Sequence, residues 1–507
     1  MTTRPKPPPT SRHRIPSSAR PSAEYALEPK HEVPSTPRRK NRRLPFHRHE
    51  GQHTPGIAIE GESYRSGIHP LKFLKICLRS SSTISMIVNV LWPFVPVAIT
   101  LHFARPDWHL WIFITNYVAM VPSANLLGFC GQELARKLPK TFGVILEVFL
   151  GSLVELVLFI VLLFTEGANG VQIIKAAILG SLLANLLLCL GGCFFAGGLK
   201  RDEQTFHEAV SEVGSGLMLV AGMGLIVPSI FAQALASYPQ SQIELDHEVV
   251  LISRGTSIML LAAFFCYVWF QMRTHHGLYE DIFEHDEHRD EDRHKDLRKE
   301  KLTLTEAIIG ILIALTCVAL IAVFLVQQIH YIVIEHGVSD AFVGLILVPL
   351  VEKAAEHLTA IDEAYDNQMN FALSHVLGAS IQTALFNTPL IVLIGWHHKP
   401  APMDLNFEIF DAAVLILAII VVGNFLRDGK SNYLEGLLCI IVYVIIALSA
   451  FFYPNPIEEA GEGTASGSEG GGEGGHEATS AETGAHAEAT AEAVKMLVRG
   501  VAHALTA

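Results

Sequence analysis

Long hydrophobic runs follow one another along most of this chain and restrict what it can fold into. Each run has about 20 residues, enough for a helix to cross roughly 30 Å of hydrocarbon. Half of all residues are hydrophobic, 17% are charged, and the mean hydropathy is +0.36, a balance typical of a membrane protein. We predict an all-α polytopic fold with about 11 transmembrane helices, at residues 84–103, 108–130, 142–164, 171–195, 213–234, 256–271, 307–326, 341–359, 372–396, 412–425 and 433–452.

Polar segments divide the chain into domains. Residues 1–80, rich in Pro, Ser and Arg, are predicted to be a disordered basic tail, and residues 455–507, rich in Gly, Glu and Ala, a second disordered tail. The acidic segment 278–300 separates a first transmembrane half, 84–272, from a second half, 303–454. We interpret this segment either as a solvated connector or as an acidic cytosolic linker helix that concentrates cations near an entrance.

Basic residues in alternate loops predict the orientation. Arg136, Lys200 and Arg427 lie in three such loops, whereas loops 165–170 and 327–340 contain no Lys or Arg. By the positive-inside rule the N-terminus is cytosolic, and an odd number of spans then places the C-terminus in a lumen or outside the cell.

Charged side chains occur inside two of the apolar runs. A carboxylate at membrane depth costs several kcal/mol unless it is paired, protonated or hydrated, so it indicates either an ion path or a buried ion pair that fixes helix packing. The side chains are Glu147 and Glu155 in the third run, and Glu352, Lys353, Glu356 and His357 in the eighth. We expect Glu155 and Glu356 to bind the ion, and the other four to set selectivity or form ion pairs.

The two runs also behave as copies of one unit. The run that contains Glu155 can be aligned with the run that contains Glu356, and the segment that follows each run is also similar in the two halves, 178–192 in the first and 376–390 in the second. With five helices in each unit, the second copy enters the membrane in the opposite sense, as in inverted-repeat transporters with a site at mid-membrane. Two facing glutamates would give a Ca²⁺-sized cation hard oxygen ligands and could bind protons instead, which suffices for exchange. The further ligands that we expect are Ser152, Ser181, Ser380 and Gln382.

Several segments resemble the vacuolar cation/proton exchangers of the calcium/cation antiporter superfamily. GSLVELVLFIVLL is similar to the first signature repeat of that family, and EKAAEHLTAIDEAY followed by LGASIQTALFNTPLIVLIGW to the second. LGSLLANLLLCLGG, SRGT and SNYLEGLLCIIVYVIIALSAFFYP match in the same order, so the resemblance covers about residues 82–454. It implies one extra N-terminal helix plus two inverted five-helix repeats, proton-driven export of cytosolic Ca²⁺ into a vacuole, and Glu155 and Glu356 as the essential pair.

The chain departs from that family at the signatures themselves. Family members usually begin both with Gly-Asn-Ala, but here residues 151–153 are Gly-Ser-Leu and residues 352–354 are Glu-Lys-Ala, and Glu147 replaces a usual Asn. A charged Lys353 would oppose a divalent ion by direct repulsion. Either Lys353 pairs with Glu147 or Glu352 and leaves the essential pair free, or it occupies the place of the cation and changes the cargo, changes the charge moved, or abolishes transport.

The function that these patterns favour is secondary active cation/proton antiport, with Ca²⁺ as the expected cargo. The alternatives are an exchanger for Na⁺, K⁺ or Mn²⁺, and a non-transporting ion-sensing paralogue. An ATP-driven pump is disfavoured because no P-loop is present, and a channel is disfavoured by the paired-acid repeats. We expect no enzymatic activity, no cofactor beyond the transported Ca²⁺ and H⁺, and no nucleic-acid partner. Membrane lipid is an expected partner, a homo-oligomer is left open, and the resemblance implies a vacuolar membrane.

Overall fold

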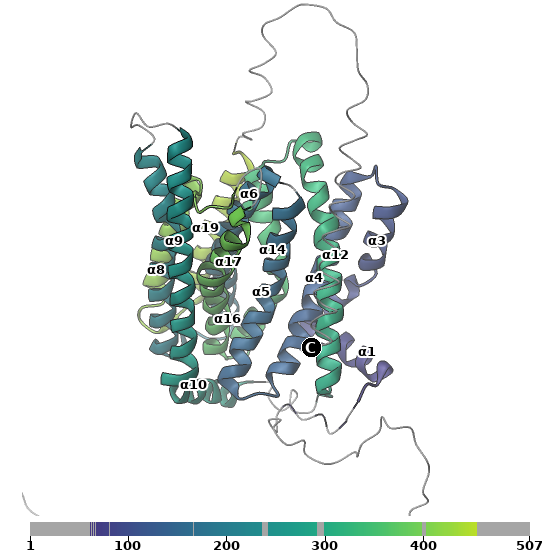
Figure 1. Ribbon diagram of the computed structural model, residues 1–507. Helices are drawn as coiled ribbons and strands as arrows, with labels where there is room; N and C mark the ends of the chain where they lie inside the picture. The colour runs from purple at the N-terminus through teal and green to yellow at the C-terminus, as the bar shows by residue number, and fades with distance from the viewer. Residues whose placement is uncertain are drawn as a thin grey trace, which may run out of the picture. The chain divides into compact units, whose positions relative to one another are not determined.

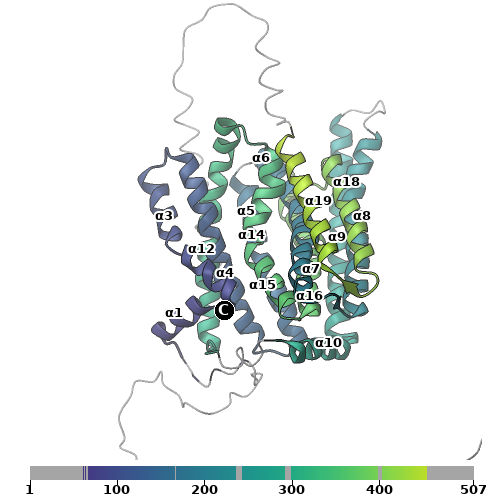
Figure 2. The same cartoon turned by 180° about the vertical axis from the view of Figure 1, so that it is seen from behind.

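The computed structural model describes residues 61, 63, 65, 67–80, 82–165, 167–235, 242–291, 299–397 and 402–453. The predicted C-terminal tail and most of the predicted N-terminal tail lie outside these residues. The described part is nearly all helical, and its two short strands, β1 (Gln204–Thr205) and β2 (Lys430–Ser431), pair antiparallel. Figures 1 and 2 show the long helices running side by side.

Nine helices in the described residues are long and apolar enough to cross a membrane. Those before the acidic linker are Ser85–Ala104 (α2 Thr83–Val88, η2 Asn89–Leu91 and α3 Phe94–Ala104), His109–Ala135 (α4), Ile145–Thr165 (in α5 Lys140–Thr165), Gly170–Gly198 (in α6 Gly167–Leu183, η3 Ala184–Cys189 and α7 Leu190–Gly198), Glu208–Leu235 (α8) and Glu244–Thr274 (in α9 Gln242–Trp269 and η4 Phe270–Thr274). Those after it are Leu304–His336 (α12), Met369–His397 (α16 Met369–Gln382, η6 Thr383–Asn387, α17 Thr388–Ile394 and η7 Gly395–His397) and Tyr433–Phe451 (α19).

The other two predicted spans have different forms. Residues 341–359 are interrupted: they fold as α13 (Asp340–Phe342), η5 (Val343–Leu347), α14 (Val348–Glu352) and the first part of α15 (Ala354–Tyr365). Residues 412–425 lie in α18 (Ile409–Phe425), a shorter apolar helix. The count of 11 spans therefore stays a prediction.

The boundary predicted at residue 80 is placed too late, because a helix precedes it. α1 (Pro70–Arg79) begins with a proline, whose missing N–H costs nothing in the first turn of a helix. Leu71 and Leu74 are exposed on this helix, which also carries Lys72 and Lys75. An exposed apolar face beside basic side chains is typical of a helix that lies at a membrane surface.

The outer surface of the bundle is apolar, whereas polar side chains lie inside it. Val220 and Met223 of α8 and Met259 of α9 are exposed, while Glu155, Ser181 and other polar residues are buried. This is the distribution expected in lipid, where helices satisfy their own backbone groups and polar side chains face the bundle interior.

The acidic linker forms a helix that is docked on the bundle. Within the predicted segment 278–300 the structure forms most of α10 (His276–Arg289), which runs across one end of the long helices (Figures 1 and 2). Its Phe283 stacks on Phe371 of α16 with ring centroids 4.9 Å apart. A connector solvated on all sides is therefore excluded for α10.

Asp286 joins α10 to the beginning of α16. Its carboxylate is buried and accepts hydrogen bonds from the backbone N–H groups of Asn370 (2.7 Å) and Phe371 (3.2 Å) and from the Asn370 side chain (2.8 Å). These backbone donors belong to the first turn of α16, where a helix cannot satisfy them itself. Burial nevertheless raises the pKa of Asp286 above its ordinary value. Asp286 thus acts as a helix cap supplied by another helix.

Replacing Asp286 by Ala should lower the melting temperature of the purified protein, because two N–H groups of α16 lose their acceptor. Loss of a cap costs about 0.5–2 kcal/mol. Thermal unfolding in detergent measures the effect. The matched control is Glu284→Ala, at an exposed position of the same helix whose carboxylate lies 4.0 Å from His288. Equal melting temperatures for the two variants would contradict the capping role.

Candidate ion-binding site

Prolines produce the irregular helix geometry around the site. The π-helical segments η5 and η6 are each followed, two residues later, by a proline, Pro349 and Pro389. Because proline has no N–H and its ring clashes with the preceding turn, the helix widens there. A further break follows Pro349, and Lys353 lies at the junction of α14 and α15. The second charged run is therefore a discontinuous helix, as transporters often have at their binding sites.

Lys353 lies between the two glutamates that the sequence singles out. Its Nζ is 3.1 Å from Oε2 of Glu155 on α5 and 3.5 Å from Oε2 of Glu356 on α15. The side chains of Lys353 and Glu155 are 1% and 0% exposed, whereas that of Glu356 is 23% exposed. One ammonium thus bridges carboxylates from the two halves of the chain, and both carboxylate oxygens of Glu356 are buried although part of its side chain is exposed.

Two further side chains bind Glu155. Oε2 of Glu155 accepts a hydrogen bond of 2.6 Å from the Thr383 hydroxyl and one of 2.9 Å from the Asn387 amide. Both donors lie on η6, in the second half of the chain. With the Lys353 ammonium, three side chains contact the same carboxylate oxygen.

A matching contact runs in the opposite direction. Asn185, which aligns with Thr383 in the two similar segments, lies on η3 in the first half, and its Oδ1 is 2.9 Å from Nε2 of His357. His357 follows Glu356 directly. The segments η3 and η6 therefore each contact the glutamate-bearing helix of the other half, and this crossed pattern supports the internal repeat.

Glycines allow the helices to approach closely here. A Cβ on Gly151 would collide with the carboxylate of Glu356, and a Cβ on Gly180 would collide with the backbone carbonyl of Leu345. A Cβ on Gly344 would lie 2.6 Å from Cβ of Ala176. Small residues at these crossings bring α5 and α6 against the interrupted helix of the second half.

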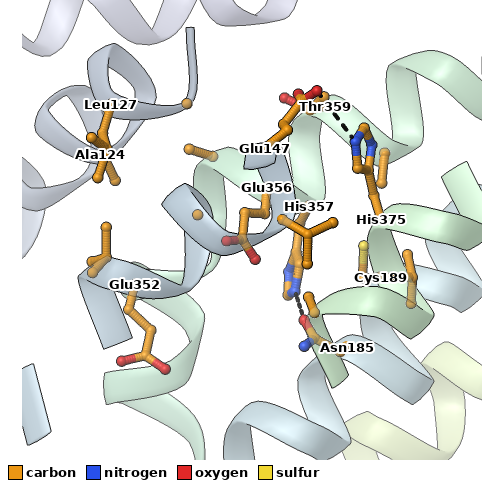
Figure 3. A pocket seen from close by; sticks show the side chains of 18 residues that line it. Ala124, Leu127, Glu147, Asn185, Cys189, Glu352, Glu356, His357, Thr359 and His375 are labelled. Atoms are coloured by element: carbon orange, nitrogen blue, oxygen red, sulfur yellow. Dashed lines mark hydrogen bonds and ion pairs between the residues drawn. The ribbon is translucent and has the colours of Figure 1, made fainter. Parts of the chain in front are cut away.

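A cavity leads to Glu356 (Figure 3). Its volume is about 50 Å³, and its walls include the apolar residues Val148 and Ala379. Glu147, Glu352, Glu356, His357 and His375 also line it. Figure 3 shows the Glu356 carboxylate at the centre of this group and Glu352 pointing away from Glu147 and His375.

The predicted site residues divide into three groups. Glu155, Glu356 and Lys353 come together, and Ser152 is adjacent, because its backbone carbonyl accepts a 3.4 Å hydrogen bond from Asn387. Glu352 is buried with both carboxylate oxygens unpartnered among the described residues. Ser181, Ser380 and Gln382 are buried without a hydrogen bond to Glu155, Glu356 or Lys353 in the described part of the chain, and the hydroxyl of Ser380 donates to the carbonyl of Val376 instead (2.8 Å).

One of the two interpretations of Lys353 is corrected. Its ion pairs are with Glu155 and Glu356 rather than with Glu147 or Glu352, because its place at the helix break turns the side chain toward α5. Glu147 instead faces His375, and the distance from Oε2 of Glu147 to Nε2 of His375 is 3.6 Å. The interpretation in which the ammonium occupies the place of a cation agrees with this geometry.

Sequence reasoning missed several polar partners. Thr383, Asn387 and Asn185 bind the central residues although hydropathy alone does not distinguish them from packing residues. The available signal was the alignment of the two similar segments, in which Asn185 and Thr383 occupy equivalent positions.

Spanning helices, a discontinuous helix and paired carboxylates at mid-bundle define a secondary ion transporter. The chain belongs to the family described as sodium/calcium exchanger protein, whose sequence model matches residues 108–273 and 306–452. Among its relatives, vacuolar cation/proton exchanger 5 of Arabidopsis thaliana is 34% identical over 73% of this chain and 82% of the relative. The vacuolar calcium ion transporter of Schizosaccharomyces pombe is 31% identical over 80% of this chain and 95% of the relative.

Solved structures agree with this assignment. The structure of the Ca²⁺/H⁺ antiporter protein YfkE has a TM-score of 0.58 at 25% identity and covers 73% of this chain and all of that protein. The crystal structure of an H⁺/Ca²⁺ exchanger has a TM-score of 0.53 at 13% identity over 74% of this chain and 90% of the exchanger, and it supports the fold.

The hydroxyl of Thr383 should contribute measurably to stability through Glu155. Thr383→Val keeps the shape of the side chain but leaves a buried carboxylate with one donor fewer, a loss of about 1.5–3 kcal/mol. Thr388→Val is the matched control, because this hydroxyl is also buried but donates to a backbone carbonyl, that of Thr383 (2.7 Å). Thermal unfolding of both variants is the measurement. The assignment fails if Thr383→Val melts at or above the temperature of the control.

Proposed function

We propose that this protein is a secondary Ca²⁺/H⁺ antiporter. The observation that carries the proposal is the meeting of Glu155 and Glu356, one from each half of the chain, on either side of a single cationic group. Two carboxylates at such a crossing supply the hard oxygen ligands that Ca²⁺ requires and the groups that protons can neutralise. The names of the relatives, which are cation/proton exchangers and calcium transporters, favour Ca²⁺ over the other cargoes and over a sensor without transport.

The proposal includes a vacuolar address and an orientation, with a cytosolic N-terminus, a luminal C-terminus and two inverted five-helix repeats after one extra helix. The relatives are named as vacuolar proteins. Basic residues of two alternate loops lie at the end of the bundle that carries α10: Lys200 is 3.0 Å from Glu291 just beyond α10, and Lys430 is 3.0 Å from Glu203 beside β1. The hydrogen bond from Lys200 lowers the pKa of Glu291. By the positive-inside rule this end is cytosolic.

The cation and the Lys353 ammonium exclude each other from the site. Two unit charges about 4 Å apart at an effective dielectric near 20 repel by about 4 kcal/mol, and a divalent ion doubles that value. Ca²⁺ can therefore lie between Glu155 and Glu356 only after the ammonium has moved or lost its proton. In the empty transporter the ammonium neutralises charge that would otherwise be buried unpaired.

Glu352 offers the displaced ammonium a second position. Both its carboxylate oxygens are buried and unpartnered among the described residues, and it precedes Lys353 in the chain. A swing of the lysine side chain from Glu356 to Glu352 would open the site while keeping the ammonium paired. Glu356 then alternates between the cation and a proton, because it is the member of the pair that the cavity reaches.

Glu155→Gln and Glu356→Gln should each abolish Ca²⁺ uptake driven by a pH gradient, because glutamine keeps the size of the side chain but removes a negative charge that binds the cation and, at Glu356, the group that exchanges a proton. Uptake by purified protein in vesicles is the measurement. Glu335→Gln, at an exposed position of α12, serves as the matched control and should exchange normally. Normal exchange by either site variant would remove that glutamate from the mechanism.

Lys353→Asn should tighten Ca²⁺ binding, because it removes the competing ammonium and supplies an amide oxygen. Even about 1.4 kcal/mol of relieved repulsion would strengthen binding about tenfold. The half-saturating Ca²⁺ concentration is measured for wild-type protein and variant at equal amounts and fixed pH. Lys175→Asn is the control, because that lysine pairs with Asp404 (2.6 Å) outside the site. Unchanged affinity, rate and charge movement in Lys353→Asn would show that the ammonium does not compete with the cation.

A further inference from the structure

Three titratable side chains from three helices meet at a second place in the bundle. Nδ1 of His375, on α16, is 2.7 Å from Oε2 of Glu363 on α15, and Nε2 is 3.6 Å from Oε2 of Glu147 on α5. The side chains are between 10% and 19% exposed. Of these three residues, only Glu147 is indicated by the sequence patterns. None of them takes part in the ion pairs of Lys353 with Glu155 and Glu356. Figure 3 shows His375 and Glu147 facing each other at the cavity.

This arrangement holds an exchangeable proton. A neutral imidazole has one N–H, so it can donate to one carboxylate while the other meets a lone pair. With a carboxylate on each side of His375, charge balance favours one additional proton, carried either by the ring or by one of the acids. Nε2 of His375 is buried without a hydrogen-bond partner among the described residues, and the His375 side chain lines the cavity.

The group lies on the way to Glu356 rather than around the cation. Glu363 follows Glu356 by seven residues, and Glu147 precedes Glu155 by eight, so each is about two helical turns from the central pair. Both steps lead toward the end of the bundle where Asp286 of α10 caps α16. Glu147 and His375 line the same cavity as Glu356.

Other charged groups act on these three side chains. Arg136, at the end of α4, interacts electrostatically with Glu147. Asp362, which precedes Glu363 on the same helix, interacts electrostatically with Glu363. Glu356 interacts with His375 across the cavity, and Asp286 of α10 is engaged with Asn370. Among the described residues no group of three or more His, Cys, Asp or Glu side chains is arranged to hold a metal ion. The ligand that this chemistry fits is a proton.

We propose that Glu147, His375 and Glu363 form an outer proton-binding site that loads and unloads the carboxylate of Glu356 through water in the cavity. In the loading step an N–H or O–H bond of the outer site breaks and an O–H bond forms on Glu356, with one proton moved and no other reactant consumed. The proposal deepens the proposed function and rests on it, because it assumes proton-coupled exchange at Glu356.

The test compares His375→Gln, Glu147→Gln and Glu363→Gln with wild-type protein in vesicles over a series of pH values. We expect the maximal rate of Ca²⁺ uptake to fall at least about tenfold and its pH dependence to flatten, because proton transfer becomes limiting. The half-saturating Ca²⁺ concentration should stay within about twofold, since the outer site does not touch the cation. The matched control is His288→Gln, at an exposed histidine 4.0 Å from Glu284, and it should behave as wild type.

The possible results separate the two proposals. Wild-type protein that moves no Ca²⁺ against a proton gradient refutes the proposed function and this proposal with it. If wild-type protein exchanges and the three variants keep its rate and pH profile, only the outer proton site is refuted. Loss of Ca²⁺ binding in the variants also refutes it, because the three residues would then belong to the cation site. Restoration of the wild-type rate in Glu147→Asp, but not in Glu147→Gln, supports proton transfer over a packing role.

Discussion

The contact of the Lys353 ammonium with Glu155 and Glu356 is the interaction on which the rest of the site depends. It places one positive charge between two negative charges that come from different halves of the chain. Removing such charges from water costs several kcal/mol for each, and only their mutual attraction and further hydrogen bonds offset that cost. Thr383 and Asn387 supply these hydrogen bonds for Glu155. The buried polar group therefore connects the two halves of the chain, and its stability depends on the Lys353 ammonium between the carboxylates.

Backbone irregularities make this contact possible. Widened turns precede Pro349 and Pro389, and the helix that carries Glu352 and Glu356 is interrupted at Lys353. Gly151 leaves room for the Glu356 side chain against α5. In the proposed mechanism such an interrupted helix would give alternating access a physical basis, because the ammonium, the cation and the proton would each favour a different position of the same side chains.

Much of the fold could be predicted because lipid imposes a simple rule on sequence. Long apolar runs are needed wherever a helix spans, and the first five predicted runs overlap the observed spans well, whereas the sixth, 256–271, is much shorter than Glu244–Thr274. The interrupted helix was harder, since the hydropathy of residues 341–359 does not register the break that follows Pro349. The pairing of Glu155 with Glu356 followed from the internal repeat. The direction of Lys353, and the meeting of Glu147 with His375 and Glu363, depend on rotamers and on helix packing that spacing along one helix does not specify.

The central claim is that Lys353 and the transported cation are alternative occupants of one site. The most direct test is a structure of the wild-type protein determined with saturating Ca²⁺. The account predicts density for the cation between the carboxylates of Glu155 and Glu356, with Nζ of Lys353 beyond ion-pair distance of both. A cation bound between these carboxylates while Nζ keeps its contacts of 3.1 and 3.5 Å would contradict it.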